Sequence, residues 1–319
     1  MHWKKIGKIF DPRDYTLTNN CKEFAQSPQA LVFDNFVRVY FSTREKEANG
    51  KFLSYISYVD FDKNMQKVLR VSDHTVIELG ELGCFDEHGI FPLNVLRDGE
   101  KILGFISGIS RRVSVPVETG IGLATSNDGG ETFVRQGPGP VLTSSLFEPF
   151  MVGDPYVLKI GDQFHMWYIF GTKWIPNAEF DGRPSRVYKI AHATSFDGLT
   201  WEKEGKLIIS DKLDVDECQA LPTVIKIGEV YHMFFCYREA VGFRNEKGRG
   251  YKLGYAFSTN LIEWSRNDEA VAINEDADSW DSEMMCYPNV FELDRKIYLL
   301  YNGNEFGRYG FGLAELIND

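Results

Sequence analysis

The sequence contains a seventeen-residue pattern that recurs five times in the same register. Each copy begins with a proline, and successive prolines lie 64, 63, 67 and 66 residues apart. Six and seven residues after each proline stand two polar or glycine residues, with apolar, β-branched and aromatic residues on both sides. This pattern predicts a β-hairpin. The five copies are 28–44, 92–108, 155–171, 222–238 and 288–304.

A second hairpin pattern follows the first in three of the five units, at 119–133, 187–201 and 251–264. In each, a strand-like stretch leads to a serine, then to an Asp or Asn two residues later, then to an aromatic residue that opens another stretch. The Asp or Asn side chain can accept hydrogen bonds from nearby backbone N–H groups and hold the turn. Each unit is therefore predicted to be a four-stranded antiparallel sheet, and five such sheets predict an all-β, five-bladed β-propeller.

The fifth unit ends one strand short, because the chain stops soon after the stretch 310–316. A candidate for the missing strand stands at the other end of the chain, where Trp3 and Gly7 have the same spacing as Trp201 and Gly205. We expect residues 3–10 to complete the last blade and close the ring. Residues 1–319 are therefore predicted to form a single propeller domain.

Composition restricts the possible partners. The 35 basic and 46 acidic residues give a net charge of −11, which argues against a nucleic acid or an anionic membrane as partner. The N-terminal stretch lacks the apolar core of a secretory signal, so a cytoplasmic location is expected. The five cysteines are scattered without metal-ligand spacing, so neither a metal nor any other cofactor is expected. Composition leaves the oligomeric state open.

The predicted loops differ in length on the two faces of the propeller. The turns within the hairpins are short, whereas the loops that enter the first strand and leave the second are long and rich in carboxylates, arginines and aromatic residues. Long loops on a rigid scaffold usually carry function, so the face with the long loops is the expected working face. Because the first strand of each blade lies nearest the axis, residues just before each proline should converge on a central mouth.

Carboxylates recur at this expected mouth. Four of the five units have a glutamate five residues before the proline, and in the third unit an aspartate, Asp154, directly precedes Pro155. Several carboxylates in one funnel would shift one another's pKa values, as acid/base chemistry with two carboxylates requires. The four glutamates are Glu23, Glu87, Glu217 and Glu283.

Three short motifs carry a resemblance to a known group of enzymes. G-D-P-Y-V-L (153–158), the S-x-D-G-x-x-W turn (195–201) and D-E-C (216–218) resemble the five-bladed glycosidases of glycoside hydrolase families 43 and 32 and their relatives. The resemblance implies a glycoside hydrolase that acts on an oligosaccharide or a polysaccharide-derived glycoside.

The same resemblance implies catalytic roles for several carboxylates. Asp154 precedes a proline, as the family's middle, tuning aspartate does, and Glu217 is followed by a cysteine, as the family's acid is. The base or nucleophile would be Glu87, or alternatively Asp86, and Glu283 competes with Glu217 as the acid. The separation of the two catalytic carboxyl groups would decide the stereochemistry, about 5–5.5 Å for retention and about 6.5–9.5 Å for inversion.

Other residues of the expected face are candidates for binding the carbohydrate. Arg44, Arg238 and Asn304 stand sixteen residues after their prolines, where the hairpin partner would bring them to the mouth. The two arginines could bind ligand groups or neutralise the glutamates. His88 adjoins Glu87, Glu23 belongs to the same ring of acids, and two tryptophans of long loops, Trp174 and Trp280, could stack on a sugar ring.

Other function classes remain open on the same scaffold. A glycosyltransferase or a glycoside phosphorylase would need a cationic cradle for phosphate, which the loops at 111–115 (RRVSV) and 244–250 (RNEKGRG) could supply. A non-catalytic carbohydrate-binding propeller would use the carboxylates only to hydrogen-bond the ligand. A sialidase is disfavoured, because the sequence has five units rather than six and lacks an F-R-I-P motif.

Overall fold

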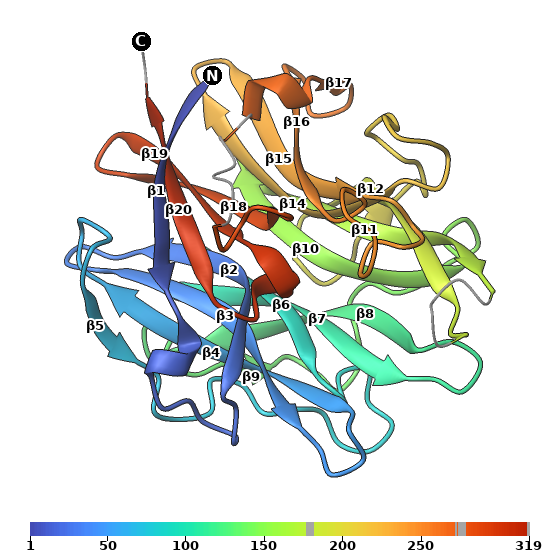
Figure 1. Cartoon of the computed structure of the whole chain (residues 1–319), viewed down its shortest axis with the longest axis horizontal. Helices are drawn as coiled ribbons and strands as arrows, with labels where there is room; N and C mark the ends of the chain where they lie inside the picture. The colour runs from blue at the N-terminus through green and yellow to red at the C-terminus, as the bar shows by residue number, and fades with distance from the viewer. Residues whose placement is uncertain (177–181, 272, 274–278, 318–319) are drawn as a thin grey trace.

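Five antiparallel sheets of four strands each are arranged as blades around a central axis (Figure 1). Figure 1 shows a computed structural model that describes residues 1–176, 182–271, 273 and 279–317. The first strands of neighbouring blades contact one another around the axis, and the remaining strands of each blade follow outward in order. The predicted all-β, five-bladed propeller is confirmed.

The blades follow one another along the chain. Blade 1 contains β2 (Glu23–Val32), β3 (Val37–Lys46), β4 (Phe52–Phe61) and β5 (Val68–Val71). Blade 2 contains β6 (Ile90–Asp98), β7 (Lys101–Arg111), β8 (Val117–Ser126) and β9 (Val134–Arg135). Blade 3 contains β10 (Phe150–Ile160), β11 (Gln163–Ile175), β12 (Ser185–Ser195) and β13 (Glu202–Lys203).

The last two blades have the same plan. Blade 4 contains β14 (Cys218–Ile227), β15 (Val230–Arg238), β16 (Lys252–Ser258) and β17 (Ser265–Arg266). Blade 5 contains β18 (Cys286–Leu293), β19 (Lys296–Asn302), β20 (Phe311–Ile317) and β1 (His2–Phe10). Outside the sheets, the residues that the structure describes form three short 3-10 helices: η1 (Pro12–Asp14), η2 (Asp268–Val271) and η3 (Asn304–Gly307). The described part of the chain has no helix long and apolar enough to cross a membrane.

The N-terminal strand closes the ring by pairing antiparallel with the C-terminal strand. In Figure 1 the blue β1 runs beside the red β20, and the register runs from His2 opposite Ile317 to Phe10 opposite Phe311. Trp3 is buried and meets the ring of Phe234 edge-on at 5.3 Å, so β1 also packs against blade 4. The predicted closure by residues 3–10 is confirmed.

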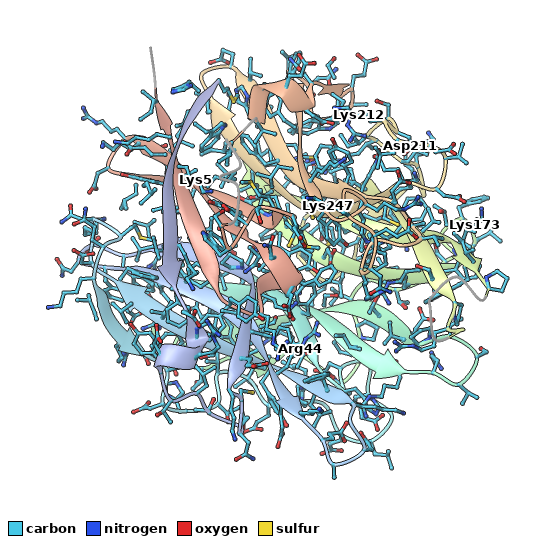
Figure 2. The ribbon with its side chains drawn as sticks, viewed as in Figure 1. Lys5, Arg44, Lys173, Asp211, Lys212 and Lys247 are labelled. Carbon is cyan, nitrogen blue, oxygen red and sulfur yellow. The ribbon has the colours of Figure 1, made fainter. Side chains whose placement is uncertain are left out.

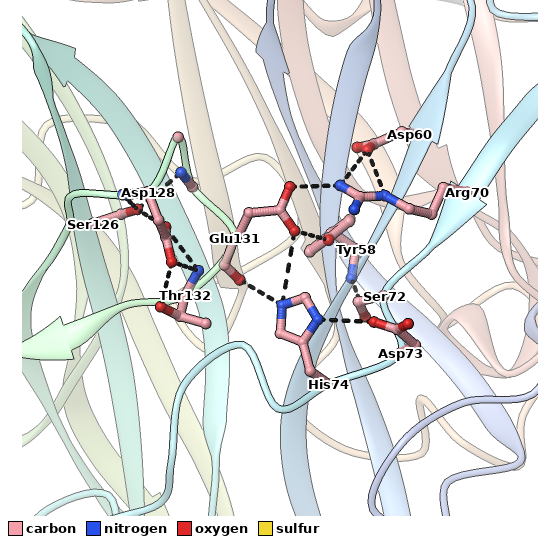
Figure 3. A network of polar contacts seen from close by, with 12 residues as sticks. Tyr58, Asp60, Arg70, Ser72, Asp73, His74, Ser126, Asp128, Glu131 and Thr132 are labelled. Atoms are coloured by element: carbon pink, nitrogen blue, oxygen red, sulfur yellow. Dashed lines mark hydrogen bonds and ion pairs between the residues drawn. The ribbon is translucent and has the colours of Figure 1, made fainter.

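Neighbouring blades pack through apolar clusters, and blades 1 and 2 also share a polar network (Figure 3). Glu131, in the turn between β8 and β9, accepts hydrogen bonds from Tyr58 at 2.5 Å, Arg70 at 2.5 Å and Arg38 at 2.9 Å, all in blade 1. Arg38, which is almost fully buried, also forms a two-pronged pair with Asp60 at 2.7 and 2.9 Å. One carboxylate of blade 2 therefore binds three side chains of blade 1, in addition to the apolar packing between the two blades.

The innermost strand of every blade is irregular near its proline. The ladder between the first and second strands shifts register there in all five blades. In four blades the residue before the proline has a positive φ between 48° and 56°, a conformation that non-glycine residues rarely adopt. Such a bulge re-aims a side chain relative to the regular alternation of the strand. The four residues are Ser27, Asp154, Leu221 and Tyr287.

Candidate active site

A cavity of about 400 Å³ opens on the propeller axis, and all five blades contribute to its lining. Its walls come from the ends of the innermost strands and from the long loops, on the face that the loop lengths predicted. Six of the lining residues are arginines, whereas Asp154 is the one carboxylate that the described residues place in the lining. The six arginines are Arg44, Arg111, Arg183, Arg186, Arg238 and Arg244.

Asp154 reaches the cavity because of the bulge in β10. Its φ of 52° turns the side chain inward, and its Oδ2 accepts a hydrogen bond from the backbone N–H of Leu221 at 3.3 Å. Burial raises the pKa of Asp154 to about 7, although the Leu221 N–H and the charge of Arg186 act in the opposite direction. A carboxyl group with this pKa is partly protonated at neutral pH, so it can donate a proton.

Within the described part of the chain, three of the lining arginines have no carboxylate partner. Arg238 is buried, donates to the hydroxyl of Tyr188 at 2.8 Å and to the carbonyl oxygen of Glu239 at 2.7 Å, and stacks on Phe243. Among the residues described, the side chains of Arg44 and Arg186 form no hydrogen bond or ion pair. An uncompensated guanidinium in a partly buried site favours an anionic ligand.

The cavity also contains buried polar atoms that have no hydrogen-bond partner within the described protein. Each of these atoms would lower the stability of the folded protein by about 1–3 kcal/mol if it stayed without a hydrogen-bond partner. Aromatic rings, among them those of Phe91 and Tyr287, also line the cavity. A ligand with both polar groups and apolar faces, as a sugar ring has, fits this lining. The unpaired atoms are Gln26 Oε1, Arg44 Nε, Thr119 Oγ1 and Arg238 Nε.

The expected ring of catalytic glutamates is not present, and the correction is clearest for Glu217. Its side chain is fully buried and pairs with Arg266 of β17 at 2.6 Å, while its other oxygen accepts from the backbone N–H groups of Lys212 and Leu213. The hydrogen-bonding capacity of this carboxylate is therefore satisfied inside the protein, and the Glu217 side chain does not line the cavity. Its expected position at the mouth is wrong.

Glu217 belongs to a repeated structural ion pair. In four blades a fully buried carboxylate, placed in the loop that enters the innermost strand, pairs with a cation of the outermost strand of the same blade. This pairing ties the entering loop to the outer edge of the blade, so these acids serve the fold. The pairs are Asp86–Arg135, Glu148–Lys203, Glu217–Arg266 and Asp281–Lys5.

The other three glutamates also lie outside the cavity lining. Glu87 accepts a hydrogen bond from the backbone N–H of Gly83 at 2.9 Å, and Glu23 pairs with Arg308 at 2.8 Å. Glu283 is exposed. The cavity lining therefore includes neither the predicted base Glu87, nor its alternative Asp86, nor the alternative acid Glu283, whereas it was expected to contain them. Their catalytic roles stay predictions.

The predicted binding residues divide between the cavity and the framework. Arg44, Arg238 and His88 line the cavity, and His88 Nδ1 accepts from the backbone N–H of Arg111 at 3.4 Å. Trp280 instead stacks on Tyr301 with ring centroids 5.4 Å apart, so it packs the blade.

Asn304 and Trp174 also lie outside the lining. The side-chain oxygen of Asn304 accepts from the backbone N–H of Glu283 at 2.9 Å, so this residue fixes a loop. Trp174 lies in β11, paired with Arg186 of β12. Figure 2 shows Arg44 nearer the middle of the ring, whereas Lys173, Asp211 and Lys212 lie nearer its edge.

Sequence reasoning missed Arg186, Tyr188 and Tyr251, which line the cavity from blades 3 and 4. The hydroxyl groups of Tyr188 and Tyr251 hydrogen-bond each other, and Tyr188 in turn binds Arg238. A usable signal was present, because arginines recur in the three longest loops after the second strands. The described residues include no cluster of His, Cys, Asp or Glu that could hold a metal ion.

Comparisons with solved structures show the same fold. A glycoside hydrolase covers 99% of this chain and 93% of its own with a TM-score of 0.75 at 16% identity. A thermostable family-43 glycoside hydrolase gives a TM-score of 0.64 over 95% of this chain and 94% of its own at 14% identity. A β-1,2-mannobiose phosphorylase from Listeria innocua gives 0.70 over 99% and 97% at 13% identity. The resemblance to the five-bladed glycosidase propellers is confirmed at the level of fold.

Comparison with curated sequences gives close relatives of the whole chain. No protein-family model matches the chain. The uncharacterized proteins MT1551 and Rv1502 of two Mycobacterium tuberculosis strains are each 31% identical to it over 319 residues, which is 100% of both chains. A five-bladed, glycosidase-like propeller with an arginine-lined axial cavity, this chain belongs to the same family as these mycobacterial proteins.

Proposed function

We propose that this protein is a carbohydrate-active enzyme of the glycoside phosphorylase type, which transfers a glycosyl unit to inorganic phosphate. The observation that carries the proposal is the content of the cavity, with one carboxyl group and six arginines among the described lining residues. A hydrolase of the inverting or retaining type needs a second carboxylate, as base or as nucleophile. Phosphate is itself an anionic nucleophile, so one acid and a cationic cradle suffice.

The reaction assigns a role to each group. Arg186 and Arg238 lie in neighbouring blades 3 and 4, and Arg186 is close enough to Asp154 to influence its pKa. These two arginines would hold phosphate beside the anomeric carbon, because no carboxylate of a described residue pairs with either guanidinium group. Asp154 would give its proton to the leaving oxygen.

The bond changes balance without a further reactant. The bond between the anomeric carbon and the leaving oxygen breaks, and a bond from the same carbon to a phosphate oxygen forms. The leaving alcohol takes the proton of Asp154, and the proton of hydrogen phosphate then restores the carboxyl group. Because a single displacement is involved, the configuration at the anomeric carbon would invert.

The expectation of a glycoside hydrolase is the alternative that the test must separate. A panel of oligosaccharides and aryl glycosides is incubated with the protein with and without inorganic phosphate. The proposal expects turnover that saturates with phosphate and that falls in Arg186→Gln more than in Arg186→Lys. Equal turnover without phosphate would establish a hydrolase, and binding without turnover would establish a carbohydrate-binding protein, so either result contradicts the proposal.

A further inference from the structure

Arg44 of blade 1 occupies an unusual position in the cavity. Its guanidinium lies 4.9 Å from the ring centroid of Phe24 and 5.9 Å from that of Phe52. These two rings contact each other edge-on at 5.9 Å, so they form one aromatic support for the cation. Arg44 is therefore held in place by rings rather than by a carboxylate.

The acidic residues nearest to Arg44 in the sequence are bound elsewhere. Glu23, directly opposite Arg44 in the ladder, pairs with Arg308, and Glu47 pairs with Arg111. Glu45 accepts a hydrogen bond from Asn20 at 3.1 Å. Among the described residues, no carboxylate therefore pairs with Arg44, although three lie within three residues of it or directly opposite. An anionic ligand would supply a counter-charge.

Gln26, which lies in the same blade as Arg44, contributes a hydrogen-bond acceptor to the cavity. This side chain is fully buried, and its Nε2 donates to the backbone oxygen of Phe306 at 2.6 Å, which fixes the orientation of the amide. Its Oε1 is then left without a partner, as is Arg44 Nε, and both residues line the cavity. A free donor on a cation and a free acceptor on an amide match a sugar that carries an anionic group and a hydroxyl group.

Arg44 comes from a different blade than the two arginines of the proposed phosphate cradle. It belongs to blade 1, whose neighbours in the ring are blades 2 and 5, whereas Arg186 and Arg238 belong to blades 3 and 4. Burial lowers the pKa of Arg44, Tyr287 acts in the opposite direction, and the charges of Arg244 and Arg186 lower the pKa further. An anion bound beside Arg44 would stabilise the charged form of its guanidinium group.

We propose that Arg44 and Gln26 form a second anion subsite, which selects a glycan bearing a carboxylate or a phosphate ester of its own. The inference rests on the proposed function, because it assigns the phosphate co-substrate to Arg186 and Arg238. It adds the substrate class, an acidic sugar rather than a neutral one. The aromatic support of Arg44 also offers ring faces against which the sugar can pack.

The test measures binding and no turnover. Isothermal titration is carried out with hexuronates, hexose phosphate esters and the neutral parent hexoses, each with and without saturating inorganic phosphate. The expected result is that at least one acidic class binds about 10-fold more tightly than its neutral parent, as one hydrogen-bonded charge pair allows. Whether the uronate or the ester binds identifies which anionic group the subsite takes.

Two variants locate the binding. Arg44→Gln should remove the preference for the acidic sugar. Its melting temperature should stay close to that of the wild type, since the loss of the ring contacts with Phe24 and Phe52 is offset by removal of a partly buried charge that pairs with no described residue. Arg186→Gln is the matched control and should keep the preference. Acidic sugars that bind no better than neutral ones, a preference that survives in Arg44→Gln, or complete displacement by phosphate would overturn the second subsite. Failure of phosphate-dependent turnover alone would overturn only the proposed function.

Discussion

At the scale of single residues, the position of Asp154 joins conformation to chemistry. A positive φ at a residue other than glycine costs about 1–3 kcal/mol, and such strain persists where the surrounding structure imposes it. The bulge that imposes it here also places the carboxyl group in a buried cavity, and burial raises its pKa to about 7. The bulge at Asp154 therefore both directs the carboxyl group into the cavity and, through burial, keeps it protonated up to a higher pH.

Replacement of Asp154 by asparagine tests its role as an acid. Asp154→Asn should lower kcat by about 100-fold or more on a substrate with a poor leaving group, as loss of a general acid does. The loss should be much smaller on an aryl glycoside whose leaving group needs no proton. Wild-type activity should decline as the pH rises through about 7, because the acid then loses its proton. The pH–rate profile and both substrates are measured by steady-state kinetics.

The stability of the same variant is the control for folding. Because the folded-state pKa of Asp154 is raised, its contribution to stability is present below the unfolded pKa and is lost as the pH rises through about 7. Asparagine tolerates positive φ and carries no charge, so the melting temperature of Asp154→Asn should equal or exceed that of the wild type above that pH. An equal loss of activity on both substrates would contradict the role as an acid.

At the scale of strands and loops, the repeated ion pair explains why the glutamates could not be assigned from the sequence. Counting back from the proline aligns residues in loops of different length, so it does not identify which side chain points at the axis. The bulge sets that direction. Of the five residues directly before a proline, Phe91, Asp154 and Tyr287 line the cavity, whereas Ser27 and Leu221 do not, and Asp154 alone of the five is acidic.

Glu217→Gln separates a structural role from a catalytic one. The change removes the charge that balances Arg266 in a buried site, so the free energy of unfolding should fall by roughly 2–4 kcal/mol. Activity per folded molecule should stay unchanged, because the side chain does not line the cavity. Denaturant unfolding and kcat are measured on the same preparation. A stable variant that has lost activity would restore Glu217 to the catalytic site.

The polar network between blades 1 and 2 makes a pH-dependent prediction. Although burial opposes it, hydrogen bonds from Tyr58, Arg70 and Arg38 lower the pKa of Glu131 to about 2. A carboxylate whose pKa is lowered by folding stabilises the folded state at pH values above its pKa in the unfolded chain. This stabilisation is lost as the pH falls through its pKa in the folded protein. Glu131→Gln should therefore cost about 1–3 kcal/mol at neutral pH and nothing near pH 2.

The control for this prediction is an exposed carboxylate. Glu204, whose pair with Lys206 is largely solvent-exposed, should give no measurable change when it is replaced by glutamine. Chemical denaturation of the three proteins over a pH series supplies the comparison. A difference between wild type and Glu131→Gln that stays constant down to the acid limit would contradict the assigned network.

At the scale of the whole molecule, the architecture was predictable because the hairpin turns and the period of the repeat are local signals. Ring closure was predictable from the missing strand and the matching Trp and Gly. The arginine cavity was only partly predictable. The loops at 111–115 and 244–250 indicated positive charge, but the placement of Arg186 and Tyr188 required the register of β11 and β12, and Tyr251 comes from the neighbouring blade, just before β16. Which groups share one cavity is decided by five blades together.

A pair of variants in β1 tests the closure. Trp3 is buried against Phe234, whereas Ile6 of the same strand is exposed. Trp3→Ala should lower the free energy of unfolding by about 3–5 kcal/mol, as loss of a buried aromatic side chain does. Ile6→Ala should change it little. Equal effects of the two substitutions in denaturant unfolding would contradict a closing strand packed as described.

We propose that phosphate, and not water, takes the glycosyl unit in this cavity. Phosphorus NMR of the wild-type protein with glycoside and inorganic phosphate observes the product itself. A new glycosyl phosphate signal of inverted anomeric configuration should grow as the phosphate signal falls, and it should be absent in Asp154→Asn. Release of free sugar with an unchanged phosphate signal would instead establish hydrolysis and rule out phosphorolysis.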